Sequence, residues 1–382
     1  MHISEIFYMR YYRAYSLLLV VIMVSIIGLG NIGSAIPPVV AQDDENRYPV
    51  YSYPVLHKIE MSVQKIEKPG DDLFGYQLDK HEIFDPKSGE LLNDITDRYT
   101  KGPTIPGPTL MFEEGDSVEL TFTNPGKSMN GICNTNPSPE NTGALGRVSI
   151  HVHGIHYSIA SDGTLGILNG LRDEGVCPGE SIKYHYTAGP GTAGTWPYHD
   201  HALGLNPSGI YIDGSETLGL FGNLVIESHT GKTVALVKGI PTKVNVADIA
   251  KDVFCYVTDD AFWCDEIDYT NNAIRTALWE NPTIGAKDGD LIRFHLYGMG
   301  TDFHIFSLTG YEWLEPGTEQ IIKDKKFGAL ENHVFTIQAK NGIAEYRDTI
   351  TSHLLSGMKG SFKVDSVGKS VPGKSPLEGV VN

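Results

Sequence analysis

The chain has 382 residues, which is enough for two domains of ordinary size. Hydrophobic residues make up 41% and charged residues 20%, as in a globular protein, while 42 glycines and 21 prolines favour short strands joined by turns. The net charge of -17 argues against nucleic acid as a partner, because phosphates would repel the chain, and fits an exported protein with a neutral or cationic substrate.

The N-terminus has the pattern of a targeting segment. Arg10 and Arg13 precede the apolar run Leu17–Leu29, and small, turn-forming residues follow as a signal-peptide cleavage site requires. The run is shorter than the ~20 residues of a membrane span, but an uncleaved anchor is the alternative. We expect a signal peptide or N-terminal anchor over residues 1–41. The remaining chain then lies outside the cytoplasm, either secreted or anchored to the outer face of the membrane.

The pattern predicts short strands in the first half of the chain. After a polar lead-in, apolar alternation begins at His57–Ile66, and Ser117–Phe122 alternates like a half-buried strand. The apolar stretch Gly219–Glu227 closes this half. Short strands with turn signals at regular spacing predict an all-β sandwich.

Two His-x-His pairs lie in this half, His151 with His153 and His199 with His201. Alternate side chains of a strand share one face, so two such strands side by side place four imidazoles on one patch. Imidazole binds copper, zinc, iron or nickel, which makes this patch a candidate metal site. The alternative is two unrelated pairs on loops. His156 is an additional histidine that either orients a ligand or lies on the surface.

The second half repeats the order of features in the first, after a linker at Ser228–Thr233. The matching segments are Lys287–Tyr297 with Glu113–Phe122, His304–Gly310 with the first His-x-His, Tyr346–Met358 with the second, and Gly357–Val364 with the closing strand. The chain is therefore predicted to be an internal duplication of one β-sandwich. We expect domains over 42–230 and 231–366, followed by a disordered tail over 367–382.

The chain contains four cysteines, and an even count in an exported chain predicts disulfides. Two fall in each half, so we pair Cys133 with Cys177 and Cys255 with Cys264. Metal thiolates are the alternative, although none of the four lies beside a His-x-His.

Residues from Gly102 to Val364 resemble the multicopper oxidases, and in the second half the ceruloplasmin-type members. The motifs that carry this resemblance are PTIPGPTLMFEEGDSVELTFTN, HVHG at His151–Gly154, WPYHDH at Trp196–His201, GLFGNLVI, and GDLIRFHLYGMGTDFH. The resemblance implies two tandem cupredoxin-like Greek-key β-sandwiches, copper as the cofactor, and oxidoreductase chemistry.

In this family a trinuclear copper cluster is held by His-x-His pairs from two facing domains. The resemblance assigns His151 to a type 2 copper position and His153, His199 and His201 to type 3 positions. These four residues would form one half of the cluster. Domain one is not expected to hold a type 1 copper, because Val148 occupies the position of the type 1 His and Asp200 that of the type 1 Cys. Asp200 is also the residue between His199 and His201.

The type 1 position of domain two is altered. The resemblance places His304, Asp348, His353 and Met358 there, with the carboxylate in place of the family's Cys. Without a thiolate, strong blue colour and fast electron transfer should be absent. Two histidines and a carboxylate would suit Cu(II), Zn(II) or Fe(II). The alternative is an empty pocket in which Asp348 pairs with a neighbouring cation such as Arg347.

The second half of the cluster is missing from domain two. Ser307 and Thr309 stand at two ligand positions, and Arg347 and Thr349 replace the histidines that flank the family's Cys. Hydroxyls are poor copper ligands, and a guanidinium brings a permanent positive charge. A complete cluster therefore cannot form in this chain, or in a ring of identical chains, unless another protein supplies the other half.

Two functions follow from these observations. The first is an exported copper oxidoreductase that acts on a small-molecule or metal-ion substrate through the domain-one histidines. The second is a cupredoxin pair that binds metal or a partner without turnover. The candidate assemblies are a homo-oligomer, such as a trimer, and a complex with a second cupredoxin protein. A trimer of the nitrite reductase type needs a type 1 Cys beside a type 2 His, and Asp200 and Asp348 argue against it.

Overall fold

The computed structural model of the chain describes residues 49, 51–68, 71–125, 148–164, 175–201, 203–205, 211–213, 219–227, 231–270 and 273–366. The predicted leader and tail lie outside these residues. Within them, α1 (Thr351–Ser356) is the one α-helix, and short 3-10 turns occur at Thr96–Arg98, Ile159–Ser161 and Val246–Asp248. No helix of this described part is long and apolar enough to cross a membrane.

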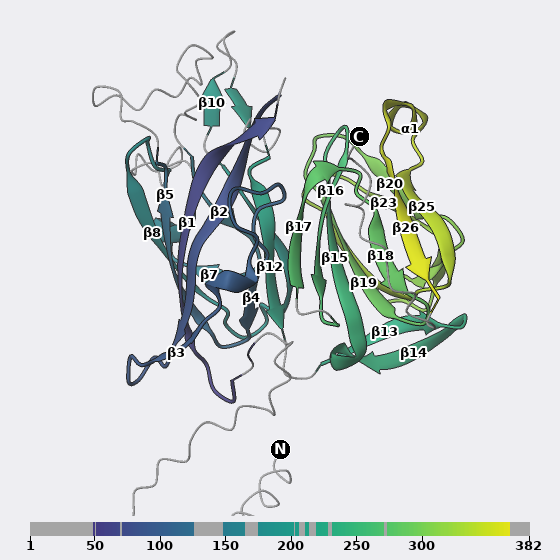
Figure 1. Ribbon diagram of the computed structural model, residues 1–382, viewed down its shortest axis with the longest axis horizontal. Coiled ribbons are helices and arrows are strands. Elements are labelled where there is room, and N and C mark those ends of the chain that lie inside the picture. Colours follow the sequence, from purple (N-terminus) through teal and green to yellow (C-terminus); the bar gives the residue numbers. More distant parts are fainter. Residues whose placement is uncertain are drawn as a thin grey trace, which may run out of the picture. The chain divides into compact units, whose positions relative to one another are not determined.

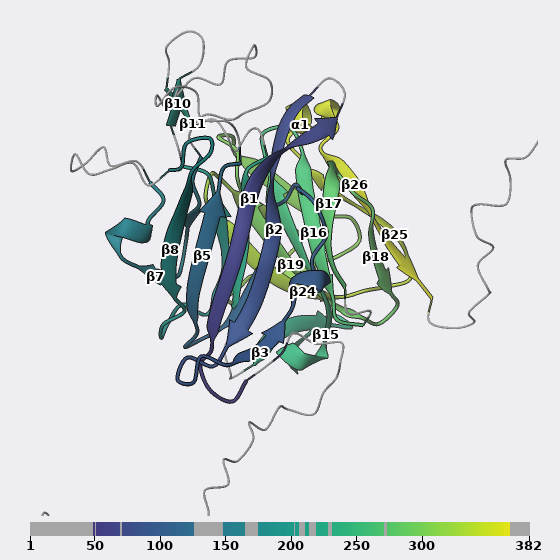
Figure 2. The ribbon, with the colours of Figure 1, turned by 60° about the vertical axis from the view of Figure 1, so that its left-hand side comes forward.

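The first half of the described chain forms a β-sandwich of two sheets (Figure 1). One sheet has the order β3-β2-β1-β5-β8-β7, and Figure 2 shows β8, β5, β1 and β2 side by side. The other has the order β4-β12-β9-β6, and β10 pairs with β11 separately. The strands are β1 (Leu56–Lys68), β2 (Asp71–Phe84), β3 (Leu91–Asp94), β4 (Leu110–Glu113), β5 (Ser117–Thr123), β6 (His151–Val152), β7 (His156–Tyr157), β8 (Ser181–Thr187), β9 (Gly194–His199), β10 (Leu203–Leu205), β11 (Tyr211–Asp213) and β12 (Phe221–Glu227).

The second half forms another sandwich. Its larger sheet has the order β14-β13-β24-β19-β15-β16-β17, its smaller sheet the order β18-β26-β25-β20-β23, and β21 pairs with β22. The strands are β13 (Lys232–Val237), β14 (Ile240–Asn245), β15 (Ile249–Val257), β16 (Phe262–Asp268), β17 (Ala273–Glu280), β18 (Ile284–Lys287), β19 (Leu291–Gly298), β20 (His304–Leu308), β21 (Trp313–Leu314), β22 (Ile321–Ile322), β23 (Asp324–Phe327), β24 (Asn332–Gln338), β25 (Gly342–Asp348) and β26 (Lys359–Asp365).

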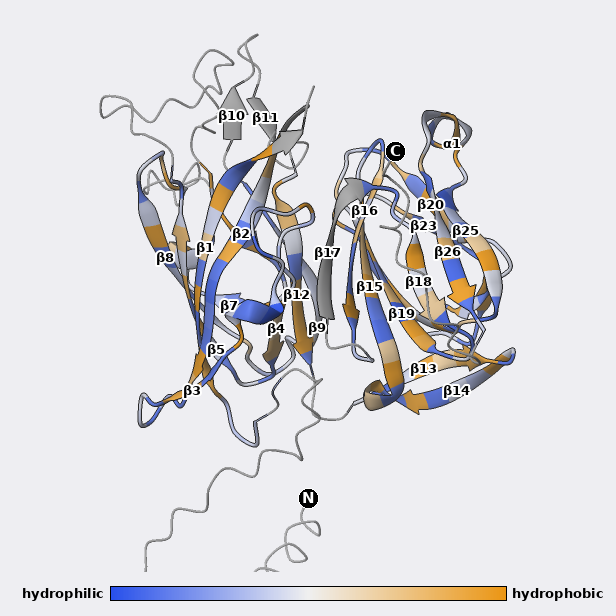
Figure 3. Ribbon diagram, in the orientation of Figure 1, coloured by the Kyte–Doolittle hydropathy of each residue, from blue (hydrophilic) through white to orange (hydrophobic). Residues whose placement is uncertain are grey.

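Alternating hydrophobicity explains how the sheets pack. In β5, Val118, Leu120 and Phe122 are buried, whereas the residues between them are half-buried. The buried side chains pack with Val152 of β6 and Leu224 of β12 in a core between the two sheets. Figure 3 shows hydrophobic and hydrophilic residues alternating along strands of both sandwiches. Burial of one face of each sheet therefore defines which side chains point into the core.

The internal repeat is visible in the pairing of the smaller sheets. In the first sandwich β12 runs parallel to β4 and antiparallel to β9, which pairs antiparallel with β6. In the second, β26 runs parallel to β18 and antiparallel to β25, which pairs antiparallel with β20. Chains that cross between sheets in this way form Greek-key sandwiches. The all-β prediction of two tandem cupredoxin-like sandwiches is confirmed.

Buried side chains of the two sandwiches pack in a shared cluster. The ring of Phe221, on β12, lies 5.0 Å from that of Tyr256 on β15, which stacks at 5.0 Å on Tyr297 of β19. The Tyr297 hydroxyl donates a 2.6 Å hydrogen bond to the Asn223 side chain. This contact combines an apolar cluster with one hydrogen bond between the sandwiches, while Nδ2 of Asn223 and the Tyr256 hydroxyl are buried without a hydrogen-bond partner among the described residues.

The linker predicted at Ser228–Thr233 is wrong at its C-terminal end. Lys232 and Thr233 already belong to β13, where they pair with Asn245 and Val244 of β14. The polar composition of this stretch suggested a loop, but the antiparallel pairing satisfies its backbone groups in a strand.

One predicted disulfide is confirmed. Cys255 and Cys264 lie directly opposite one another on β15 and β16, and their sulfur atoms are 2.11 Å apart. This excludes thiolate metal ligation by these two residues. Cys177 is also disulfide-bonded. Its predicted partner, Cys133, lies outside the described residues.

Candidate metal centre

The two His-x-His pairs meet where β6 lies against β9. His151 and His199 are directly opposite in the antiparallel register of these strands. β6 ends at Val152 and β9 ends at His199, so His153 and His201 follow the strands rather than continue them. The predicted convergence occurs, but strand alternation explains only the positions of His151 and His199.

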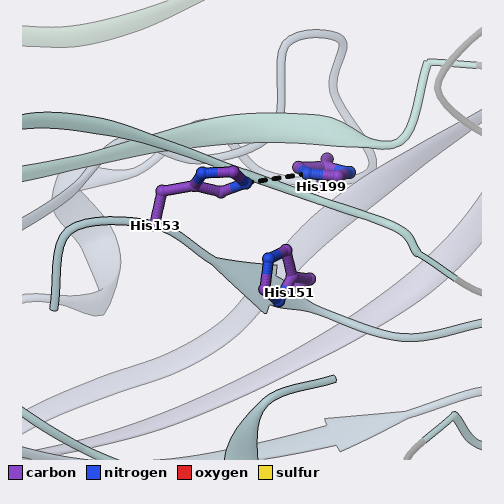
Figure 4. Close-up of side chains that lie close together, drawn as sticks. All are labelled: His151, His153 and His199. Atoms are coloured by element: carbon purple, nitrogen blue, oxygen red, sulfur yellow. Dashed lines mark hydrogen bonds between the residues drawn. The ribbon is translucent and has the colours of Figure 1, made fainter. Parts of the chain in front are cut away.

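Three imidazoles form the centre of the site, which we call the histidine cluster (Figure 4). One ring nitrogen from each of His151, His153 and His199 lies within 4.8 Å of the others. The Nε2 atoms of His153 and His199 are 3.0 Å apart and face one another. The His151 ring centroid lies 4.8 Å from that of His153 and 5.4 Å from that of His199. Such spacing allows all three nitrogens to bind the same ion.

His201 borders the histidine cluster. Its ring centroid lies 5.3 Å from that of His151 and 5.6 Å from that of His199. Its Nδ1 atom is buried and has no hydrogen-bond partner in the described part of the chain. His156 is exposed on β7, which supports its interpretation as a surface histidine.

Backbone carbonyls orient two of the rings. The Nδ1 atom of His151 lies 2.5 Å from the carbonyl oxygen of Asp162, and Nδ1 of His199 lies 3.0 Å from that of Asp200. A carbonyl can only accept, so each Nδ1 carries the proton and each Nε2 keeps its lone pair for a metal. The role of Asp162 was missed in the sequence, because a carbonyl contact leaves no signal in residue type.

Two of the imidazoles, His151 and His153, are held in the neutral form that a metal ligand needs. Burial and the neighbouring imidazoles, His199 first, lower the pKa of His153 to about 3. Burial also lowers the pKa of His151, although the Asp162 carbonyl opposes the shift. Protons therefore do not compete for these nitrogens at neutral pH.

The turn after His153 depends on a glycine. Gly154 has a φ of +65°, and a Cβ at this position would lie 2.0 Å from the Trp196 ring. Trp196 is anchored by a 2.8 Å hydrogen bond from Nε1 to the carbonyl of Thr192. The indole thus packs directly against the backbone that carries His153.

The predicted type 1 residues of domain two also converge. Asp348, at the end of β25, is fully buried, and its Oδ2 lies 2.8 Å from Nδ1 of His304 and 2.7 Å from Nδ1 of His353. His304 begins β20, and His353 lies on α1. Met358 is buried, and its carbonyl accepts a hydrogen bond from the Asp348 backbone. We call His304, Asp348 and His353 the carboxylate site.

The alternative pairing of Asp348 with Arg347 is wrong. Arg347 bonds Glu345 at 3.3 Å, on the outward face of β25, while Asp348 points into the sandwich. Adjacent residues of a strand point to opposite faces, so these two side chains cannot meet. Burial raises the pKa of Asp348, but hydrogen bonds from His304, Ile350 and His353 outweigh it and hold the pKa below its ordinary value.

The positions of the missing half-cluster line an open groove of about 550 Å³. Ser307, Thr309, Arg347 and Thr349 contribute to its wall, with Lys323 and Asp324 nearby. No histidine lines this groove. Its lining offers hydroxyls, cations and the carboxylates of Glu312 and Asp324 but no imidazole, so it lacks the histidines that the second half of a copper cluster needs.

Comparisons with known proteins agree with this geometry. Residues 140–231 match a family model described as "Multicopper oxidase". The chain is 26% identical over 275 residues to a probable nitrite reductase-hydroxylamine oxidoreductase fusion protein of Kuenenia stuttgartiensis, covering 70% of this chain and 28% of that protein. It is 33% identical over 109 residues to the multicopper oxidase MCE of Talaromyces pinophilus, covering 28% of this chain and 14% of that protein. The chain thus spans less than a third of the length of these relatives.

Among solved structures, the fold resembles the blue copper oxidase of Nitrosomonas europaea, with a TM-score of 0.50 and 16% identity over 80% of this chain and 85% of that one. This likeness concerns the fold. The two sandwiches give the chain the cupredoxin-type fold of such oxidases, and the histidine cluster lies on the first of them. The family model, over residues 140–231, and the curated relatives show that this part of the chain is similar to the multicopper oxidases.

Copper is the cofactor that this family implies, and the two candidate sites differ in how they fit it. The histidine cluster offers neutral imidazoles with free Nε2 lone pairs, which suit copper. The carboxylate site has no thiolate, so the residues present do not fit a type 1 copper.

Proposed function

We propose that the chain binds copper through His151, His153, His199 and His201 and acts as a copper-dependent oxidoreductase. The observation that carries the proposal is the convergence of three ring nitrogens within 4.8 Å, with Nδ1 of His151 and His199 held by backbone carbonyls. Ligand orientation from a second layer of contacts is typical of metal sites.

Bound copper supplies one-electron chemistry. His153 and His199 keep their Nε2 atoms 3.0 Å apart, a separation that a single proton can bridge in the metal-free site. Burial keeps His151 and His153 neutral, so neither carries a second proton at neutral pH, and the bridging proton need only move off the Nε2 of His153 before the ligands bind. Asp162 lies 3.4 Å from His151 and adds a negative charge beside the positive ion.

The histidine cluster resembles one half of a trinuclear site, so we propose that a partner completes it. A second cupredoxin protein would supply the missing imidazoles. A trimer of identical chains would offer only the groove of Ser307 and Arg347. The substrate class we propose is a small molecule or a metal ion.

The second candidate function is metal or partner binding without turnover. The observation that favours it is the groove without histidine at the position of the second half-cluster. The carboxylate of Asp348 in place of a thiolate also favours binding without turnover, because the thiolate-bound copper that usually receives the electrons cannot form.

The experiment begins with the full chain stripped of metal and reloaded with copper. We expect copper to bind the chain and His199→Ala to lose the copper held at the histidine cluster, whereas the exposed His185→Ala on β8 retains it. Reloaded protein is then supplied with phenols, ferrous iron, cuprous copper or, in view of the relative from Kuenenia stuttgartiensis, nitrite. Turnover lost in His199→Ala supports the oxidoreductase; copper without turnover supports the second candidate. A chain that binds no copper contradicts both.

We also propose that the chain is exported. The N-terminal apolar run and the Cys255–Cys264 disulfide support this, since disulfides persist in oxidising compartments. Mass spectrometry of protein from the producing cell, fractionated by compartment, would show whether residues 1–41 are removed. Reduced, uncleaved protein in the cytoplasm would contradict export.

A further inference from the structure

We propose that the carboxylate site of the second sandwich is a thiolate-free cation site that takes Zn(II) or Cu(II) on His304, Asp348 and His353. It is separate from the histidine cluster and binds whether or not the proposed oxidoreductase function holds. It replaces the electron-entry copper of the family with a cation that does not accept electrons readily.

The donor atoms already converge. One carboxylate oxygen, Oδ2 of Asp348, faces Nδ1 of both His304 and His353. With metal–ligand bonds of about 2.0 Å, donors 2.7–2.8 Å apart subtend roughly 85–90° at the ion, and a small outward shift gives tetrahedral angles. A cation therefore enters by replacing the shared protons rather than by refolding the site.

The donors are held in place from outside. Oδ1 of Asp348 accepts the backbone N–H groups of Ile305 and Ile350 at 3.2 and 2.9 Å, which leaves Oδ2 directed at the histidines. The Asp302 carboxylate lies 3.5 Å from Nε2 of His353. A proton is thereby favoured on that Nε2, so that Nδ1 can turn its lone pair toward the ion once the cation replaces the proton shared with Asp348.

The first sandwich provides an internal comparison. Asp200 is buried at the matching position and accepts the N–H of Ser149 at 2.6 Å, as Asp348 accepts that of Ile305. Its own N–H bonds the Leu220 carbonyl at 3.0 Å, as that of Asp348 bonds the Met358 carbonyl.

The neighbours of the two aspartates differ. In the first sandwich the residues that match His304 and Met358 are Val148 and Leu220, and the Ser149 hydroxyl bonds Asp200 at 3.0 Å. The fold thus accommodates a buried carboxylate at this place with Val148 and Leu220, rather than a histidine and a methionine, at the matching positions. The two imidazoles aimed at Asp348 are an addition that hydrogen bonding of the carboxylate does not require, and a cation explains both.

The ligand set determines which ions bind. A carboxylate with two imidazoles favours Cu(II) and Zn(II), whereas a thiolate or thioether favours Cu(I). Copper in this site should therefore be non-blue and stay oxidised. Because its ligands come from β20, β25 and α1, the ion would also tie α1 to the sandwich.

Zinc titration of the metal-free full chain in the His199→Ala background tests the proposal, since this variant removes a histidine-cluster ligand. We expect saturable Zn(II) binding that weakens at least about tenfold in Asp348→Asn and in His304→Val, which installs the first-sandwich residue. Asp324→Asn, an exposed aspartate on β23, is the matched control and should bind unchanged. The proposal is overturned if Asp348→Asn binds Zn(II) as tightly as the His199→Ala chain that keeps Asp348, or if that chain binds no Zn(II).

A gain-of-colour variant guards against simple misfolding of Asp348→Asn. Asp348→Cys loaded with Cu(II) should turn blue, because the added thiolate would join His304 and His353 on one ion. The chain before this substitution, loaded in the same way, should show a Cu(II) EPR signal without blue absorption. Folded Asp348→Cys that binds no copper, or a blue signal with Asp348 intact, contradicts the convergence we propose. If copper does not bind the histidine cluster, the zinc titration and the colour of Asp348→Cys are unaffected. The two proposals can therefore be tested separately.

Discussion

Asp265 is a buried carboxyl on β16, and Thr109 donates a 2.5 Å hydrogen bond to its Oδ2. Burial raises its pKa to about 8, and the Thr109 bond only partly opposes the shift. The folded chain therefore keeps a proton that the unfolded chain releases at its ordinary pKa of 3.8.

The contribution of Asp265 to the free energy of unfolding is fully present below 3.8, the pKa of this carboxyl in the unfolded chain. It is lost as the pH rises through about 8, its pKa in the folded chain. We predict that the free energy of unfolding falls by up to about 1.4 kcal/mol per pH unit across this window from this group alone. Asp265→Asn, which stays neutral, should remove the slope in urea titrations at several pH values. An unchanged slope would show that Asp265 is ionised in the folded chain.

A row of hydrogen-bonded polar side chains is buried in the first sandwich. His57 contacts Asp116 at 3.1 Å and His81 at 2.9 Å, and His81 contacts the Tyr99 hydroxyl at 3.0 Å. Burial, and then the neighbouring His57, hold the pKa of His81 well below its ordinary value.

The unfolded chain binds a proton on His81 that the folded chain rejects, so its contribution to stability is present above about pH 6.5 and is lost as pH falls below it. We predict that His81→Gln, which keeps a donor and an acceptor, flattens the acid side of the stability profile. His185→Gln, an exposed histidine, is the control. Equal acid sensitivity of His81→Gln and the original chain would contradict this origin.

At this scale the sequence predicted the imidazoles but not what orients them. His151, His153 and His199 are evident from their spacing, because His-x-His is a pattern of residue types. The Asp162 carbonyl is not, since any residue type carries a carbonyl and only the turn geometry brings it to His151. The direction of Asp348 away from Arg347 follows from strand alternation and could have been foreseen.

At the scale of elements, Gly154 links strand β6 to the histidine cluster. Its positive φ and the 2.0 Å approach of a Cβ to Trp196 make any larger residue incompatible with the present turn. We predict that Gly154→Ala lowers both copper content and the free energy of unfolding, the latter by more than about 1 kcal/mol.

Gly191→Ala supplies the control for this substitution. Its φ is also positive, at +87°, but a Cβ there meets nothing within 4 Å. The comparison separates backbone strain from collision with the indole. If both variants lose equal stability and keep their copper, the contact between Gly154 and Trp196 does not support the site.

The elements themselves were predictable to different degrees. The alternation of β5 and of β20 is explicit in the sequence, and the repeat of features predicted the matching sheets. The strand β6, only two residues long, was not predictable as such, because its limits depend on pairing with β9. Pairing with β14 in a tight hairpin decided that Lys232 begins a strand rather than continues a linker.

For the whole molecule, the contact between the sandwiches includes the hydrogen bond from Tyr297 to Asn223, both fully buried. We predict that Tyr297→Phe costs about 1–3 kcal/mol of unfolding free energy, because the Asn223 oxygen loses its donor. Calorimetry should show a lower Tm for both sandwiches together.

Tyr311→Phe is the control for a tyrosine hydroxyl that bonds only within the second sandwich, since this hydroxyl donates to the Lys340 carbonyl at 3.2 Å and accepts the Lys340 N–H at 2.9 Å. A loss confined to one of two separate transitions in Tyr297→Phe would show that the sandwiches unfold independently.

Anomalous diffraction from copper-loaded crystals tests the central claim, copper binding at the histidine cluster, most directly. We expect a copper peak within bonding distance of Nε2 of His151, His153 or His199, at about 2.0 Å, with the Nδ1 atoms of His151 and His199 still on their carbonyls. Copper found only at other places in a fully loaded crystal, with Nε2 of His153 and Nε2 of His199 still hydrogen-bonded to one another, would contradict the account.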